Sequence, residues 1–213
     1  MATATFSGGQ KALAIDSAYE QLTETAMQYR EKHVYTYLGN RGLQVKILQG
    51  PDATQNNVAQ FAPDPSMVFI TGVGHGTATS FTKDLSEDVF AVGAYDPQEV
   101  RGKIVHLFAC ETAKMLGPNF VTNGCLAFFG YSELFTYDQN SAEMFLECDG
   151  AIDLALADGL DASNALARAK DTFDKYVKQL LANPKTVQSA HALQFNRDSL
   201  RLLGDPTAKL IST

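Results

Sequence analysis

The sequence predicts an α/β fold in which a mostly parallel central sheet is flanked by helices. The first observation is a series of short apolar runs, at residues 12–15, 43–48, 67–73, 103–109 and 125–130. Runs of this length, bounded by turn residues, are typical of buried parallel strands. The second observation is that stretches of helical spacing alternate with these runs. Such alternation is the pattern of a parallel sheet that is covered on both faces.

The first elements follow from local signals near the N-terminus. Residues 1–10 are small and polar, and we expect a loose arm there. Asp16 and Ser17 follow the first apolar run and can cap a helix that extends to about residue 33. After the second run, residues 53–62 predict a short helix. The chain therefore begins with a strand, a helix, a second strand and a second helix.

The middle of the chain adds smaller elements around the third and fourth runs. Residues 77–89 are polar and predict a long loop or hairpin, followed by a small strand at 89–92. A helical turn is expected at Asp96, before the fourth run. A helical stretch should follow Cys110 and end at Gly124, which precedes the fifth run.

The last third is mainly helical. Apolar side chains share one helical face over residues 142–159. Asp161 can cap a second helix that ends at Asn183, directly before a proline. The apolar run that begins at residue 199 and the turn after it can add an edge strand. We expect residues 1–213 to form a single domain, as the length allows.

The composition of the chain argues against several classes of binding partner. A net charge of −7 argues against a nucleic-acid partner. No apolar run approaches the ~20 residues that a membrane span needs. The N-terminal residues lack the pattern of a secretory signal. The three cysteines suggest neither a disulfide framework nor a zinc site. We therefore expect a protein of the reducing cytoplasm, with no metal or cofactor and no membrane partner.

Two reactive side chains stand where predicted strands end. His75 follows the third apolar run, and Cys110 follows the fourth. Because chemistry in open parallel sheets lies beyond the carboxyl ends of the strands, the two form a candidate Cys–His dyad. Cys110 is expected to open a helix whose dipole would favour the thiolate. The backbone amides of Gly76 and Cys110 are candidate oxyanion donors.

The other cysteines and histidines favour structural roles. Cys125 lies on a predicted buried strand and Cys148 on the apolar face of a helix, where free cysteines are usually inert. His106 lies inside a strand and is expected to be a hydrogen-bonded core or edge histidine. His33 and His191 are expected at the surface.

A glycine-rich stretch raises nucleotide binding as an alternative. Gly72, Gly74 and Gly76 alternate, which resembles part of a dinucleotide-binding fingerprint. The spacing of that fingerprint is not met, and no helix clearly follows the glycines. Nucleotide binding is therefore not favoured.

Several short motifs together resemble the caspase-like cysteine peptidases, most of all the CHAT domains and the gingipains. Gly-His75-Gly matches the histidine motif of this group, and Phe-Ala-Cys110-Glu-Thr is similar to the segment that carries the CHAT nucleophile. Leu203-Gly-Asp-Pro-Thr207 resembles a terminal segment of the same chains. The resemblance covers residues 65–207. It implies a caspase-like three-layer sandwich and peptide-bond hydrolysis, with Cys110 as nucleophile and His75 as acid and base.

The substrate pocket departs from the pattern of this group. Metacaspase-like members carry an aspartate two residues before the cysteine, where this chain has Phe108. Asp16, Phe108 and Glu133 are candidate substrate-binding residues. If Asp16 supplies the missing charge, cleavage after basic residues is expected, since a carboxylate pairs well with lysine or arginine. The alternative role of Asp16 is a simple helix cap.

Three functions remain open from the sequence. The first is a cysteine endopeptidase that acts on protein or peptide substrates. The second is a catalytically silent caspase-like module that binds a regulatory protein partner, which the absence of the pocket aspartate favours. The third is a different Cys–His hydrolase or transferase. A selective reaction of Cys110 with a thiol probe would favour an enzyme.

Overall fold

A computed structural model describes residues 9–84 and 86–210, so most of the expected arm at 1–10 lies outside the described residues. Its centre is a six-stranded sheet in the order β2-β1-β3-β7-β8-β9. The strands are β1 (Lys11–Asp16), β2 (Gln44–Gln49), β3 (Met67–Val73), β7 (Ile104–Phe108), β8 (Ala127–Tyr131) and β9 (Leu200–Gly204). Neighbouring strands are parallel except that β9 runs antiparallel to β8, which confirms the predicted edge strand.

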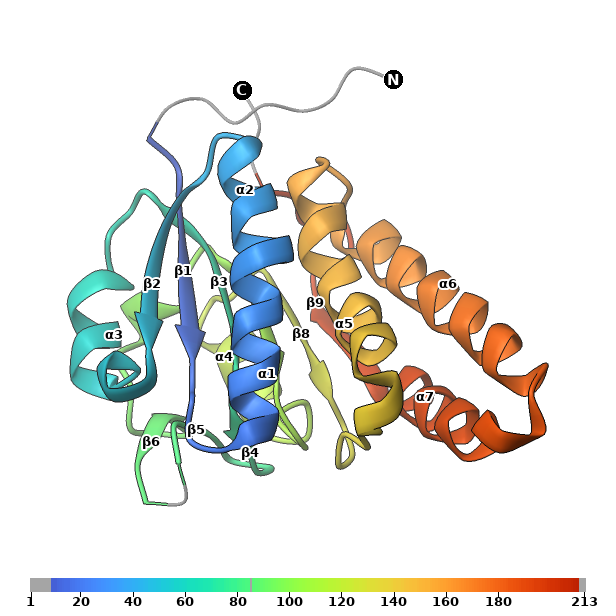
Figure 1. Ribbon diagram of the computed structural model, residues 1–213. Helices are drawn as coiled ribbons and strands as arrows, with labels where there is room; N and C mark the ends of the chain where they lie inside the picture. The colour runs from blue at the N-terminus through green and yellow to red at the C-terminus, as the bar shows by residue number, and fades with distance from the viewer. Residues whose placement is uncertain (1–8, 85, 211–213) are drawn as a thin grey trace.

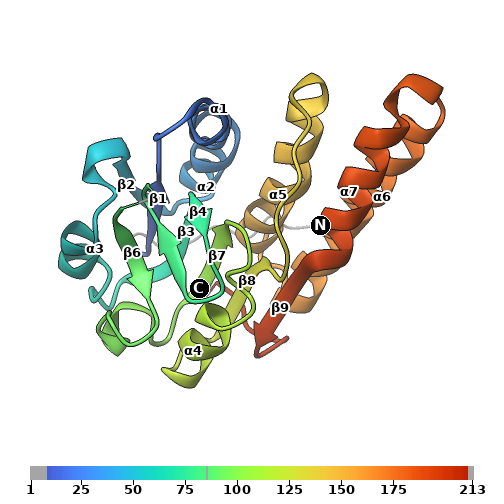
Figure 2. The same cartoon turned by 90° about the horizontal axis from the view of Figure 1, so that it is seen from below.

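Helices cover both faces of this sheet, as Figures 1 and 2 show. Alternation along β1 sends Ala12 and Ala14 to one face and Leu13 and Ile15 to the other. The first face carries α1 (Gln21–Tyr29), α2 (Thr36–Asn40) and α5 (Ala142–Ala157), and α6 (Ala162–Leu181) and α7 (Val187–Ser199) extend that layer. The second face carries α3 (Gln55–Phe61) and α4 (Leu116–Thr122). The predicted three-layer α/β class is confirmed.

The first helix differs from its prediction at both ends. It begins at Gln21, and the backbone N–H of Glu20 donates to Thr23 Oγ1 at 3.2 Å. Asp16 does not cap it, because this residue stays in β1 and its carboxylate accepts hydrogen bonds from the Val73 N–H and the Tyr35 hydroxyl. The helix also continues beyond residue 33. A π-helical turn at Arg30–Tyr35 joins α1 to α2 without a break.

A helix that the sequence analysis did not predict, α7, precedes the edge strand. It presents Ala190 and Leu193 to the core between more polar positions. Within the described part of the chain, no helix has the length and apolar character that a membrane crossing would require.

A buried charge cluster lies between the sheet and the first layer of helices. At its centre is Arg30, which is 1% exposed. Its guanidinium lies 3.1 Å from Asp149 Oδ2 and 3.3 Å from Asp153 Oδ1, both on α5, and its Nε donates to Tyr35 at 3.0 Å. We call Arg30, His106, Asp149, Asp153 and Asp16 the buried charge cluster. The hydroxyls of Tyr35, Thr71 and Tyr131 complete its hydrogen bonds.

His106 is the second cation of this cluster and is fully buried, which confirms its predicted core role. Its Nδ1 lies 2.8 Å from Asp153 Oδ2 and its Nε2 lies 3.3 Å from Asp149 Oδ1. Burial alone would lower the pKa of His106, but the two carboxylates outweigh that effect and raise the pKa to about 9. These three residues have the composition of metal ligands, yet Arg30 already neutralises the same two carboxylates.

Stability is expected to fall in alkaline solution because of His106. Its pKa rises from 6.5 to about 9 on folding, so its contribution is fully present below pH 6.5 and is lost as the pH rises through 9. Urea denaturation at several pH values would measure this slope. The variant His106→Gln should lose much of it, whereas His191→Gln, at an exposed position, should keep it. An equal slope in both variants would contradict the assignment.

Candidate active site

The candidate site lies at the carboxyl edge of the central sheet, which faces the viewer in Figure 2. Val73, the last residue of β3, pairs with Phe108, the last residue of β7. His75 and Cys110 therefore each follow a paired strand end by two residues. His75 opens β4 (His75–Gly76), which forms a small antiparallel sheet with β5 (Ser80–Thr82) and β6 (Asp88–Ala91). The predicted hairpin beside the site is confirmed.

His75 and Cys110 line the same cavity, which has a volume of about 50 Å³. The remaining walls come from α1, from the ends of β3 and β7, and from the segment after β8. The lining residues are Leu22, Thr23, Ala26, Val73, Gly74, His75, Phe108, Ala109, Cys110 and Phe135. His75 and Cys110, which are 35 positions apart in the sequence, are thus brought to one small space.

Gly76 explains how β4 approaches Cys110 so closely. A Cβ atom at this position would lie 2.2 Å from the Cys110 carbonyl oxygen and 2.9 Å from a methyl group of Thr112. Only glycine leaves room for that approach. The oxyanion role of the Gly76 and Cys110 amides stays a prediction, but the two peptide units lie side by side.

The environment of the Cys110 thiol corrects one expectation. Cys110 does not open a helix, because α4 begins only at Leu116 and the residues between form turns. Glu111, the next residue, has a left-handed backbone with φ of 58°. Burial raises the pKa of the Cys110 thiol and Glu111 adds to the effect, whereas the Phe135 N–H, 3.2 Å from Sγ, opposes it. Formation of a thiolate at Cys110 would therefore depend on a nearby base, because no helix begins at this residue.

Glu20 is the candidate residue that the sequence analysis missed. Its Oε1 lies 3.4 Å from His75 Nε2, close enough for an ion pair although the angles do not make a hydrogen bond. Among the described residues, the buried Nε2 has no hydrogen-bond partner. The Tyr19 ring meets the His75 ring edge-on, with centroids 6.3 Å apart. The sequence held one signal for Glu20: residues 17–20 join β1 to α1 and therefore lie at the same edge of the sheet as His75.

Asp16 does not line the cavity, which corrects the prediction of a basic pocket. The residue is fully buried. Both carboxylate oxygens accept the Tyr35 hydroxyl, and Arg30 Nε lies 3.9 Å away. Burial raises the pKa of Asp16 to about 6, although Arg30 and Tyr35 oppose that shift. The Asp16 carboxylate is therefore not exposed to a substrate cation in this structure.

The other two predicted pocket residues have different positions. Phe108 is a wall of the cavity. Glu133 is an exposed residue outside it, and its carboxylate lies 3.5 Å from Lys114 Nζ. The backbone carbonyl of Glu133 accepts the Glu111 N–H at 3.2 Å, which links it to the turn after Cys110. A role for Glu133 in substrate binding stays a prediction.

The remaining cysteines and histidines match their predicted structural roles. Cys125 is 4% exposed, and its Sγ is 3.3 Å from the Lys103 carbonyl oxygen. Burial raises the pKa of Cys125 to about 12 and also raises that of the fully buried Cys148. His33 and His191 are exposed. Neither buried thiol is available as a nucleophile.

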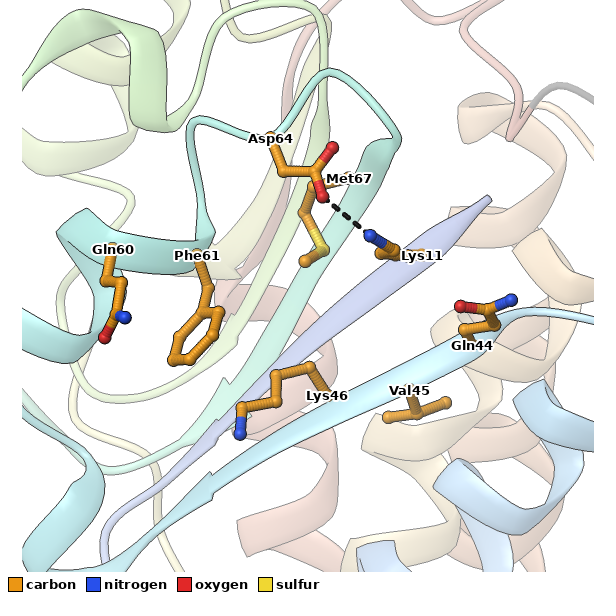
Figure 3. Close-up of a pocket in the computed structure, with 8 residues that line it drawn as sticks. All are labelled: Lys11, Gln44, Val45, Lys46, Gln60, Phe61, Asp64 and Met67. Carbon is orange, nitrogen blue, oxygen red and sulfur yellow. Dashed lines mark hydrogen bonds and ion pairs between the residues drawn. The ribbon is translucent and has the colours of Figure 1, made fainter. Parts of the chain in front are cut away.

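A larger cavity, of about 330 Å³, lies at the opposite edge of the sheet (Figure 3). The amino ends of β1, β2 and β3 form it together with the end of α3. Lys11 and Asp64 face each other across one side at 2.7 Å, and the Lys46 ammonium lies over the Phe61 ring. None of the predicted site residues lines this cavity. Its size alone does not make it the reaction site.

Comparison with known proteins finds similarity in structure but not in sequence. No model of a protein family matches the chain, and no curated protein matches its sequence. Solved structures do match. One is the crystal structure of the Arg-specific cysteine proteinase gingipain R (RgpB), with a TM-score of 0.65 and 12% identity over 95% of this chain. Another is the complex of the pro- and mature domains of Porphyromonas gingivalis RgpB, with a TM-score of 0.63 and 12% identity over 95% of this chain.

These matches concern the fold. This chain spans 48% of the length of each gingipain structure, and an identity of 12% carries no residue assignments. The caspase-like architecture expected from the sequence motifs is thus confirmed as a fold. The closer resemblance to CHAT domains finds no such support.

Proposed function

We propose that this chain is a cysteine peptidase that hydrolyses peptide bonds with a Cys110–His75 dyad. One observation carries the proposal: both side chains line a single cavity at the carboxyl edge of the parallel sheet. That edge is where open α/β sheets carry their chemistry. The fold is also that of a known cysteine proteinase, which makes this reaction the first to test.

The proposed reaction begins with proton transfer from the Cys110 thiol to His75. The thiolate attacks the scissile carbonyl carbon, and the amides of Gly76 and Cys110 stabilise the oxyanion. His75 then gives the proton to the leaving amine, so that a thioester to Cys110 remains. A water molecule, deprotonated by His75, hydrolyses the thioester and regenerates the thiol. Because burial raises the pKa of Cys110, the base is an essential part of this sequence.

Covalent labelling tests this proposal. A peptidyl chloromethyl ketone should alkylate Cys110 in the native protein and leave the buried Cys125 and Cys148 unmodified, as peptide mass spectrometry would measure. The variant His75→Ala should lose this labelling in the folded protein. After denaturation, iodoacetamide should modify all three thiols in both proteins. Labelling of Cys125 instead of Cys110 would contradict the proposed nucleophile.

A catalytically silent module is the second candidate. Two observations favour it: the thiol pKa is raised, and the Phe135 N–H contacts Sγ beside a cavity of only about 50 Å³. Because one of the similar solved structures is a complex with a pro-domain, we expect such a silent module to bind a protein partner. If Cys110 in the folded protein resists both the ketone and iodoacetamide, this second function is supported instead.

Two narrower expectations depend on the peptidase function. Membership of the CHAT group rests on the short motifs at His75 and Cys110 alone. A reducing compartment such as the cytoplasm would keep Cys110 a free thiol, which the mechanism requires. Cleavage after basic residues is no longer proposed, because Asp16 is already paired with Arg30.

Glu20 is expected to position the His75 ring for this reaction. Since Glu20 Oε1 lies 3.4 Å from Nε2, the carboxylate would stabilise the imidazolium and leave Nδ1 for proton exchange. Glu20→Gln should lower kcat by roughly tenfold, leave KM little changed, and shift the pH profile of kcat/KM. Glu24→Gln, in the first turn of α1, is the matched control. Identical pH profiles for the two variants would exclude the positioning role.

A further inference from the structure

Apart from His75 and Cys110, the side chains that line the cavity at Cys110 carry no ionisable group. On the α1 side these are Leu22, Thr23 and Ala26. The Thr23 hydroxyl is engaged, because it donates to the Glu20 carbonyl oxygen at 3.0 Å. The volume of about 50 Å³ has room for a few water molecules or a small aliphatic group. A guanidinium on its three-carbon stem would extend beyond this volume.

Aromatic rings form the opposite wall of the cavity, and this wall is held next to Cys110. The rings of Phe108 and Phe135 meet edge-on with centroids 4.5 Å apart, and Phe135 also packs on Tyr131 at 4.9 Å. The Phe135 N–H contacts Cys110 Sγ at 3.2 Å. The fully buried Asn196 holds the next residue, Thr136, by accepting its N–H at 2.9 Å and donating to its carbonyl at 2.7 Å. Phe135 therefore limits the depth of the cavity.

The carboxylates around this site are turned to other partners. Asp16, behind the wall, is paired with Tyr35 and lies 3.9 Å from Arg30. Glu111 and Glu133 both face Lys114 outside the cavity. Glu20 lies at the rim against His75. A lysine or arginine side chain in the cavity would lose its hydration, and the nearest of these carboxylates, that of Glu20, already faces His75; binding a cation there is therefore unfavourable.

We propose that this cavity binds the side chain preceding the scissile bond, and that it accepts small, uncharged, apolar side chains such as those of alanine and valine. Phe108 and Phe135 set the size limit. The assignment rests on the proposed peptidase function, because a side chain bound here precedes a carbonyl held next to Cys110. In this respect the chain differs from the Arg-specific proteinase that shares its fold.

A matched set of fluorogenic peptides tests the proposal on the unmodified protein. The peptides differ only in the residue before the scissile bond: alanine, valine, phenylalanine, arginine or aspartate. We expect kcat/KM for alanine or valine to exceed that for each of the other three by roughly tenfold or more. A preference for phenylalanine, arginine or aspartate, or a flat profile, would overturn the pocket assignment. If no peptide is cleaved and the ketone does not label Cys110, the peptidase function itself fails and the assignment falls with it.

The size limit is tested with Phe135→Ala. Removing this ring should deepen the cavity and raise kcat/KM for the phenylalanine peptide, relative to the alanine peptide, by roughly tenfold. Phe195→Ala, at an exposed position on α7, is the matched control and should leave the profile unchanged. Thermal melts would establish that both variants are folded. An unchanged ratio in a folded Phe135→Ala protein would exclude Phe135 as the residue that sets the limit.

Discussion

Replacing Cys110 with alanine is expected to abolish peptide hydrolysis while the protein stays folded. The loss in kcat/KM should be roughly a thousandfold or more, because in the proposed mechanism the Cys110 thiolate forms the covalent intermediate, and among the described residues no other thiol lines the cavity. Stability should change by about 1 kcal/mol or less, since Cys110 lies in a partly exposed turn and its thiol accepts the Phe135 N–H. Progress curves with the alanine peptide and a thermal melt would measure both effects.

Cys125→Ala is the matched control for this variant. The side chain is 4% exposed between β7 and β8, so its removal leaves a small cavity in the core. We expect the opposite pattern: a lower melting temperature and nearly unchanged kcat/KM. If the Cys125 variant is the inactive one and Cys110→Ala still cleaves peptides, the nucleophile has been assigned to the wrong cysteine.

The second large effect is expected at Arg30. Arg30→Met should lower the free energy of unfolding by roughly 3–5 kcal/mol, because it removes the cation and leaves buried carboxylates without it. Asp149 and Asp153 each lie within 3.3 Å of the guanidinium, and all three side chains are at most 2% exposed. Within the buried charge cluster, His106 would then be the one cation left beside these two carboxylates. Urea denaturation at pH 7 would measure the loss.

Arg168→Met provides the comparison at the surface. Arg168 lies 2.6 Å from Asp158, but its side chain is 43% exposed. Exposed ion pairs are worth about 1 kcal/mol or less, so this variant should be nearly as stable as the parent protein. Similar losses in the Arg30 and Arg168 variants would mean that burial does not amplify the Arg30 contacts.

The sheet and the convergence of His75 and Cys110 could be predicted because both follow from local patterns. Apolar runs of strand length determine where the strands lie, and the parallel arrangement brings their carboxyl ends to one edge. Asp161 likewise caps α6 as predicted, since its side chain accepts the Asn164 N–H. Such signals lie within a few residues of the element that they define.

The buried charge cluster could not be predicted in the same way. Arg30 and Asp149 are 119 positions apart, and neither stands in a motif that points to the other. The local sequence predicts Asp16 as a helix cap, but in the structure its carboxylate accepts hydrogen bonds from Tyr35 and Val73 instead. The helix α7 was missed because its core-facing residues are few and lie between polar ones. The size of the cavity at Cys110 likewise depends on where Phe135 packs, and the spacing of residues in the sequence does not predict that position.

The helix and the loop that line the cavity at Cys110 differ in how easily they can move to admit a larger side chain. Leu22, Thr23 and Ala26 stand on the same uninterrupted helical rod as Arg30 and Tyr35, because the π-helical turn joins α1 to α2. Sliding or rolling this rod to widen the cavity would pull Arg30 out of its ion pairs. The ion pairs of Arg30 thus hold this helical rod near its middle. A bulkier substrate side chain would therefore have to be accommodated by movement of Phe135, because a loop rather than a helix forms that wall.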